Sequence, residues 1–109
     1  MNLESDPDEI LFDGEKIGCP SLEVDTAGQV MTLIWDYEEG LNVWAFFNRY
    51  FQGYDTKFQV IASWLTDQGI KQSTFDGCFP LHFRQLTGFG LDQKSVLQMK
   101  VWFVRMREA

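Results

Sequence analysis

Apolar residues recur at every second position along several stretches of the chain. Around Ala27-Gly28 they fall at Leu22, Val24, Val30 and Ile34, and near the C-terminus at Leu97, Met99, Val101 and Phe103. In the C-terminal stretch, Gln98, Lys100 and Trp102 occupy the alternate positions. A period of two places successive side chains on opposite faces of a strand. The pattern therefore predicts strands in both regions, with Ile34 and Trp35 on opposite faces of their sheet.

Turn residues separate these stretches. Asp13-Gly14 lies between apolar flanks, and Asp76-Gly77 repeats the pair later in the chain. Asp-Gly accepts the positive φ angles of a type I′ turn, whose twist matches that of paired strands. Both pairs therefore predict β-hairpins. Pro80 has no backbone N–H to donate, so its strand is expected to be short or to lie at a sheet edge.

One segment has the spacing of a helix. Asp55 or Thr56 would cap its start, and its apolar side chains share one helical face. These side chains are Phe58, Ile61, Ala62 and Leu65. Gly69 then has the place of a residue that ends a helix in the left-handed conformation. We predict a helix over about residues 56–68.

The segment 41–51 fits two structures. Its aromatic residues and asparagines favour a strand, whereas Leu41, Trp44, Ala45 and Phe51 would line one face of a helix. We favour the strand, with residues 38–40 as the turn that precedes it.

Together these elements predict an α+β fold, an antiparallel β-sheet built from hairpins with one helix packed on one face. Residues 1–8 read as an acidic N-terminal arm and residues 9–109 as a single domain. Aromatic residues make up 16% of the chain, more than one short helix is expected to cover. Either the sheet curls on itself, or an aromatic patch stays exposed and marks an interface.

The formal net charge of −7 makes some classes of partner less expected than others. The chain has no basic stripe of the kind that phosphate binding requires, so a nucleic-acid partner is not expected. It also has no run of about 18 apolar residues, so no membrane span is expected. The N-terminus lacks the pattern of a secretory signal. These features, with two cysteines in all, predict a cytoplasmic protein with reduced thiols.

Candidate catalytic and metal-binding residues are few. His82 lies four residues after Cys78, which in a strand is about 13 Å, too far for a nucleophilic pair. Asp76, Cys78 and His82 lack the spacing of a zinc site. The glycines around Gly88 match neither phosphate-binding fingerprint. We therefore expect no enzyme activity, no cofactor and no metal.

The remaining hypothesis is a small acidic protein-binding module, such as an inhibitor, immunity protein or adaptor. It would dock on a larger, basic protein through an aromatic sheet face with an acidic rim, because aromatic residues are enriched in interface cores. The expected anchors are Trp35, Tyr37, Trp44 and Tyr50, and the expected steering charges are Asp36, Glu38 and Glu39. The alternatives are a structural subunit of a homo-oligomer or viral particle, and a small-molecule carrier or enzyme with rings lining a cavity.

Overall fold

The computed structural model describes residues 6–52, 57–89 and 94–108. The N-terminal half contains the strands β1 (Glu9–Phe12), β2 (Glu15–Lys16), β3 (Ser21–Asp25) and β4 (Val30–Asp36), followed by the helix α1 (Tyr37–Gln52). The C-terminal half contains the strands β5 (Phe58–Thr66), β6 (Gly69–Phe89), β7 (Lys94–Trp102) and β8 (Arg105–Glu108).

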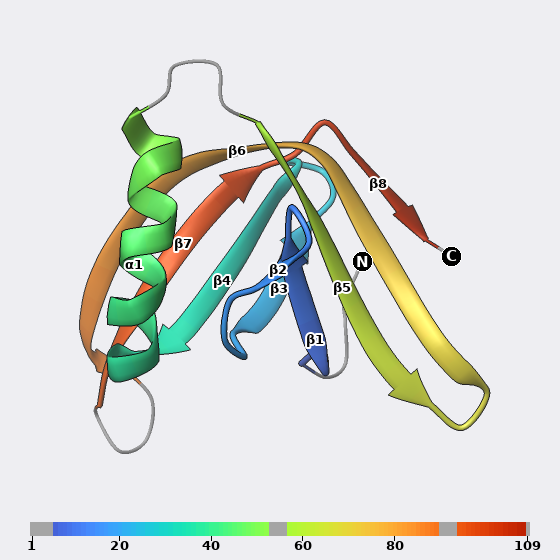
Figure 1. The fold of residues 1–109 in the computed structure, drawn as a ribbon, viewed down its shortest axis with the longest axis horizontal. Coiled ribbons are helices and arrows are strands. Elements are labelled where there is room, and N and C mark those ends of the chain that lie inside the picture. The colour runs from blue at the N-terminus through green and yellow to red at the C-terminus, as the bar shows by residue number, and fades with distance from the viewer. Residues whose placement is uncertain (1–5, 53–56, 90–93, 109) are drawn as a thin grey trace.

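The strands form one antiparallel sheet in the order β2-β1-β5-β6-β7-β4-β3, and β8 also pairs with β6. The predicted α+β fold, an antiparallel sheet with a packed helix, is confirmed. The hairpin at Asp13-Gly14 is confirmed too, since both residues have positive φ and Phe12 pairs with Glu15. The sheet bends strongly, and β6 passes over the top of the molecule from one wall to the other (Figure 1).

The long strand β6 joins the two walls. Residues up to Cys78 pair with β5, and residues from Phe79 onward pair with β7. The predicted hairpin at Asp76-Gly77 is therefore wrong: Gly77 has a φ of 65°, and the strand bends there without reversing. Among the described residues, only β7 pairs with the stretch from Phe79 onward. The expectation for Pro80, an edge strand, agrees with this arrangement.

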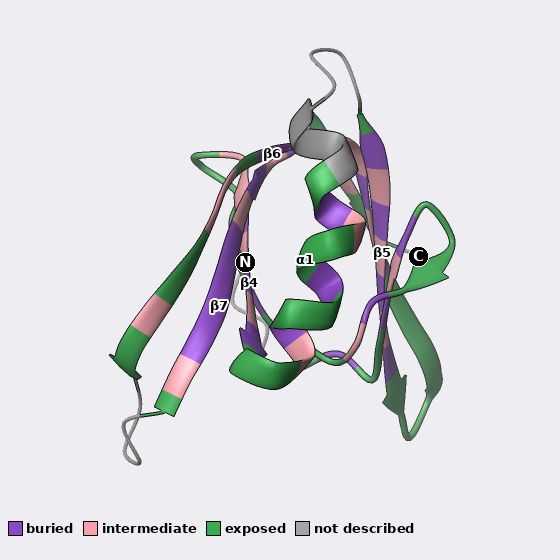
Figure 2. Ribbon diagram, turned by 60° about the vertical axis from the view of Figure 1, so that its left-hand side comes forward, coloured by how far each residue is buried: buried purple, intermediate pink, exposed green. Residues whose placement is uncertain are grey.

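The helix α1 occupies the segment for which we favoured a strand. The predicted strand over 41–51 and the turn over 38–40 are both wrong, because Glu38 and Glu39 form the first turn of α1. Acidic residues in a first turn interact favourably with the helix dipole. Val43 and Phe47, one turn apart, are buried. Figure 2 shows α1 between the wall of β4 and β7 and the wall of β5, so the curled sheet covers the inner side of the helix.

The segment predicted to be a helix is the strand β5. Every second residue from the start of β5 is buried, namely Phe58, Val60, Ala62 and Trp64. This period of two is that of a strand, so the predicted helix over 56–68 is wrong. β5 lies between β1 and β6 and pairs with both. Gly69, with a φ of 114°, belongs to the β5–β6 hairpin and does not end a helix.

The core lies between α1 and the inner face of the sheet. The predicted alternation at the C-terminus is confirmed, because Leu97, Met99, Val101 and Phe103 are all buried. Aromatic rings from four different elements meet around Phe47. The sheet thus curls on itself around much of the ring surface.

Most of the expected acidic arm lies outside the described residues. Within the part that is described, the backbone N–H of Asp8 donates to the carbonyl of Ser63 at 2.8 Å. The Asp8 carboxylate accepts from the Leu65 N–H at 2.6 Å. Residue 8 is therefore attached to β5 by two hydrogen bonds.

Candidate functional site

Trp35 is a core residue. Its side chain is only 1% exposed, and its indole Nε1–H donates to the carbonyl of Ile17 at 2.8 Å. The ring also stacks on Phe83 with a centroid distance of 6.0 Å. The prediction that Trp35 is a surface anchor is therefore wrong. β4 turns this residue toward the helix, and the sequence pattern could place Trp35 opposite Ile34 without showing which face is covered.

Two of the predicted anchors do reach the surface, but from the helix. Tyr37 is 37% exposed and Trp44 is 40% exposed. The predicted aromatic sheet face is wrong at this point, because both residues belong to α1. Leu41, which we did not predict, is 49% exposed and lies between them. Residues at i, i+4 and i+7 share one helical face, so a helical interpretation of the segment would have revealed this stripe.

A shallow groove runs beside this stripe. Its volume is about 210 Å³, and Leu41, Trp44, Phe83, Arg84, Gln85 and Leu97 line it. Trp44 packs on Phe83 with the ring centroids 4.8 Å apart, which forms the floor between α1 and β6. The outer wall is the part of β6 that pairs only with β7 among the described strands. We call the exposed residues Tyr37, Leu41 and Trp44, with this groove, the helix stripe.

The three predicted steering acids fall at the start of α1, but they are not equivalent. Asp36 and Glu38 are exposed. Glu39 is partly buried, and its Oε1 accepts a hydrogen bond of 2.6 Å from the backbone N–H of Cys19. Gly18 lies against the same carboxylate, because a Cβ on Gly18 would be 2.5 Å from Glu39 Oε1. Glu39 therefore holds the β2–β3 connection, and only Asp36 and Glu38 are placed to steer a partner.

Tyr50, the fourth predicted anchor, belongs to the last turns of α1. The position of its side chain lies outside what the structure describes.

The candidate catalytic residues do not converge. The Cys78 thiol is buried and donates to the Phe75 carbonyl at 3.3 Å, and burial raises its pKa to about 12. His82 pairs instead with Lys100 on β7, beyond a register shift in β6. Burial, together with the charges of Arg84 and Lys100, lowers the pKa of His82. Among the residues that the structure describes, no three His, Cys, Asp or Glu side chains are grouped to hold a metal ion.

Asp76 is the centre of a charged cluster on β6. Arg107 Nε lies 2.6 Å from Asp76 Oδ2, Arg105 Nε lies 3.2 Å from the same oxygen, and Gln59 donates to Oδ1 at 3.0 Å. The Arg107 guanidinium, more than the other donors, holds the pKa of Asp76 far below its ordinary value of 3.8. These contacts connect β8 to β6 where the long strand bends.

Replacing Asp76 with asparagine should lower stability at neutral pH and should matter less in acid. A carboxylate whose pKa is depressed by folding stabilises the folded state above its unfolded pKa of 3.8 and stops doing so as the pH falls through the folded pKa. Urea midpoints of wild type and Asp76→Asn at pH 7 and pH 3 test this, with Glu23→Gln on exposed β3 as control. A difference that stays the same at both pH values would contradict the assignment.

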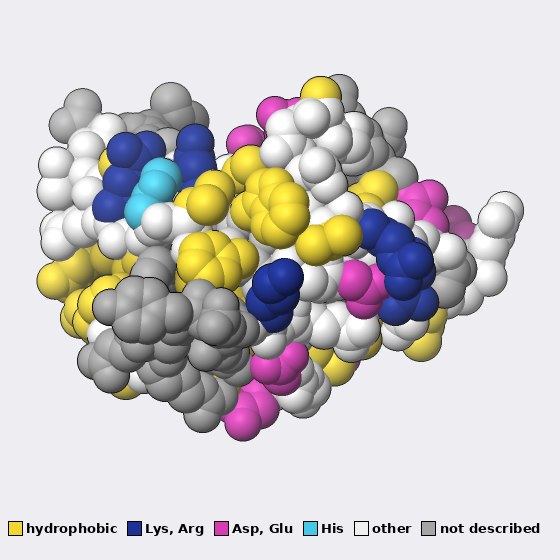
Figure 3. Space-filling view, turned by 90° about the horizontal axis from the view of Figure 1, so that it is seen from above, with side chains coloured by type: hydrophobic (Ala, Val, Ile, Leu, Met, Phe, Trp, Pro, Cys, Tyr) yellow, Lys and Arg dark blue, Asp and Glu magenta, His cyan; other side chains and the backbone are white. Residues whose placement is uncertain are grey.

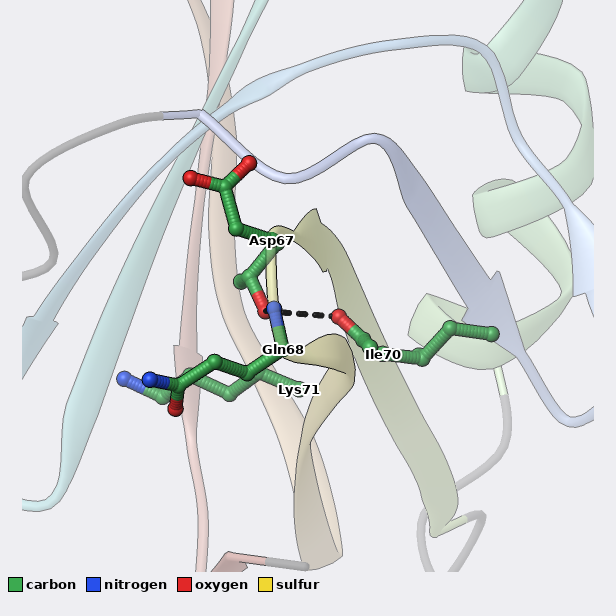
Figure 4. Close-up of a pocket in the computed structure, with 6 residues that line it drawn as sticks. Asp67, Gln68, Ile70 and Lys71 are labelled. Carbon is green, nitrogen blue, oxygen red and sulfur yellow. Dashed lines mark hydrogen bonds between the residues drawn. The ribbon is translucent and has the colours of Figure 1, made fainter.

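A hollow of about 510 Å³ lies at the β5–β6 turn (Figure 4). Its lining consists of residues 66–71, six consecutive positions of one hairpin. Thr66 Oγ1 donates to the Gly69 carbonyl at 2.7 Å and accepts from the Gln68 N–H at 3.2 Å, which closes the turn on itself. Because the lining residues all belong to this one hairpin, the hollow is the concave side of a turn and does not enclose a ligand.

In the described part of the chain, none of the helices has the length and apolar character that crossing a membrane requires. Comparison of the sequence and structure with protein-family models, curated proteins and solved structures gave no match in any of the three.

Proposed function

We propose that this protein is a non-enzymatic, acidic protein-binding module that docks on a larger, basic protein through the helix stripe. The observation that carries the proposal is the exposure of Tyr37, Leu41 and Trp44 together on one side of α1, beside a groove. Large apolar side chains grouped at the surface and bordered by polar residues are typical of interaction sites. Tryptophan and tyrosine are also the residues most enriched among binding hot spots.

The charges around the helix stripe suit a basic partner. Asp36 and Glu38 are exposed beside its first turn, and the chain as a whole has a net charge of −7. Long-range attraction between opposite charges raises the association rate more than it raises the lifetime of a complex. Arg84, the charged residue of the groove lining, donates to Gln98 at 2.8 Å. The exposed acids at the start of α1 are therefore the charges that would attract a basic partner.

A matched pair of helix variants tests the proposal. Leu41→Glu puts a charge into the stripe, whereas Asn42→Glu puts the same charge at the next exposed position, away from Trp44. We expect a partner captured stoichiometrically by wild type and by Asn42→Glu to bind Leu41→Glu at least about tenfold more weakly, as for a hot-spot residue. Titration calorimetry with the purified partner measures the effect. Equal affinity for both variants would exclude the stripe as the docking site.

The steering acids have a separate kinetic signature. Asp36→Lys with Glu38→Lys should slow association and flatten its dependence on salt, while the dissociation rate changes little. Glu39 is left intact, because its hydrogen bond to Cys19 is structural. An unchanged association rate at low salt would remove the steering role from these two residues.

A further inference from the structure

The tip of the β5–β6 hairpin carries the most exposed large hydrophobic side chains of the described residues. Leu65 is 72% exposed and its cross-strand partner Ile70 is 64% exposed. The hairpin projects from the lower edge of the molecule (Figure 1). A pair of aliphatic side chains at the tip of a projecting hairpin adds little to the stability of one copy, since most of each side chain stays in water. Apolar side chains exposed side by side in this way mark an interaction surface.

Acidic residues surround this pair. The Asp8 carboxylate binds the Leu65 N–H, Glu9 lies opposite Ser63 on the adjacent strand, and Asp67 projects from the turn (Figure 4). Lys71 is also near the tip, but its ammonium group lies over the Trp64 ring, 6.0 Å from the centroid. We call Leu65 and Ile70, with Asp8, Glu9 and Asp67, the hairpin patch.

A second apolar surface, with the opposite charge, lies at the bend of β6. Leu81 is 49% exposed and Val104 is 48% exposed, and the half-buried Phe79 and Trp102 form a cross-strand pair. Seen from above, hydrophobic side chains occupy the middle of this end of the molecule, with basic side chains on either side (Figure 3). We call these four residues, with the basic residues Arg84 and Lys100, the crest.

The two basic residues of the crest are close together because of the strand register. Lys100 lies directly opposite His82, and Arg84 follows two positions after His82 on the same strand. His82 itself adds no positive charge at neutral pH, because burial and these two cations lower its pKa. On the other side of Lys100 the neighbour is Thr32, and an acid, Glu23, appears only on the strand beyond. Asp76 also lies near the bend, but its carboxylate forms ion pairs with Arg105 and Arg107. In a chain with nine basic and sixteen acidic residues, the crest is a local concentration of positive charge.

One copy cannot join its own hairpin patch to its own crest. Phe79 at the bend lies ten positions after Gly69 at the hairpin along β6, which is about 33 Å of extended strand. The two surfaces lie at opposite ends of the molecule (Figure 1). An apolar, acidic patch and an apolar, basic patch at opposite ends are complementary only between two molecules.

We propose that the chain self-associates head to tail, with the hairpin patch of one copy docked on the crest of the next. Leu65 and Ile70 cover Leu81 and Trp102, while Asp8, Glu9 and Asp67 face Lys100 and Arg84. Such a contact uses two different surfaces, so it produces rings if the rotation between copies closes and open filaments if it does not. The exposed residues of the helix stripe, Tyr37, Leu41 and Trp44, take no part in this contact, and the two surfaces share only Arg84, which lines the groove. The variants that test self-association leave Arg84 and α1 unchanged, so their outcome is separate from that of the proposed function.

Sedimentation velocity over a range of protein concentrations tests the proposal. Wild type should form species larger than a dimer as the concentration rises, and the association should weaken at high salt, which screens the charged rim. Leu65→Ser with Ile70→Ser, or Lys100→Glu alone, should each raise the dissociation constant at least about tenfold, since one anchor of a hot spot is worth that much. Lys16→Glu, at an exposed position on β2, is the charge-matched control and should associate like wild type.

Mixing the two variants gives the decisive result. The hairpin variant retains an intact crest and Lys100→Glu retains an intact hairpin patch, so the mixture should form one-to-one heterodimers and nothing larger. A wild-type protein that remains monomeric at every concentration would overturn the inference, and so would oligomers that both variants leave unchanged. A mixture without heterodimers would also overturn it, because the contact would then use the same surface on both copies. Circular dichroism confirms that each variant is folded.

Discussion

Replacing Phe47 with alanine should lower the free energy of unfolding by about 3–5 kcal/mol, the usual cost of removing a fully buried ring. Phe47 is 0% exposed. Its ring centroid lies 4.7 Å from that of Phe12, 5.9 Å from that of Trp35 and 6.2 Å from that of Phe58. These rings belong to three strands on both walls of the sheet, so the cavity would open where the walls and α1 meet.

Urea denaturation followed by circular dichroism measures this effect, and Leu41→Ala on the exposed side of the same helix is the matched control. Leu41 is 49% exposed, so its truncation should cost less than about 1 kcal/mol. A small cost at Phe47, or a cost equal to that at Leu41, would show that α1 is not the element that fills the curled sheet.

Gly40→Ala should destabilise the protein by about 1–2 kcal/mol, although alanine is normally the better helix former by about 1 kcal/mol. Gly40 lies in the first turns of α1, where the helix crosses β7. A Cβ at this position would lie 2.5 Å from Leu97 Cδ1 and 2.7 Å from Leu97 Cβ. The Cβ of Leu97 cannot rotate away, so the helix or the strand must move.

The sign of the change in stability shows whether α1 lies against β7 at Leu97. Asn42→Ala, at an exposed position of the same helix, should raise stability by a few tenths of a kcal/mol through propensity alone. In a Leu97→Ala background, Gly40→Ala should cost less than in wild type, because two of the three closest atoms are gone. An increase in stability with Gly40→Ala in the wild-type background would mean that α1 does not lie against β7 at Leu97.

Both experiments concern the contact between helix and sheet, and the proposed docking through the helix stripe depends on that contact. The helix stripe exists because Val43 and Phe47 face the core, which leaves Tyr37, Leu41 and Trp44 on an exposed face of α1. If Phe47→Ala loses stability and Leu41→Glu loses binding, then one face of α1 fills the core and another face docks the partner. The hairpin patch and the crest do not involve this helix, so their test remains separate.

Local sequence determined the elements whose hydrogen-bond partners are close along the chain. Asp13-Gly14 specifies its hairpin because both residues accept positive φ angles. The strand β7 follows from the alternation of Leu97, Met99 and Val101, which no helix can place on one face. The α+β class also follows from the residues alone, although the helix and one strand exchange places.

Only the tertiary structure decided between helix and strand in the middle of the chain. The segments 37–52 and 58–66 are both rich in apolar and aromatic residues, and each fits a period of 2 and a period of 3.6 over so short a length. β5 is a strand because β1 and β6 satisfy its backbone on both sides. The segment 37–52 is a helix inside the curl of the sheet, where its own hydrogen bonds satisfy its backbone. The exposure of Leu41, the burial of Trp35 and the bend at Gly77 follow from that arrangement, because burial is set by which elements meet in space and not by neighbours in the chain.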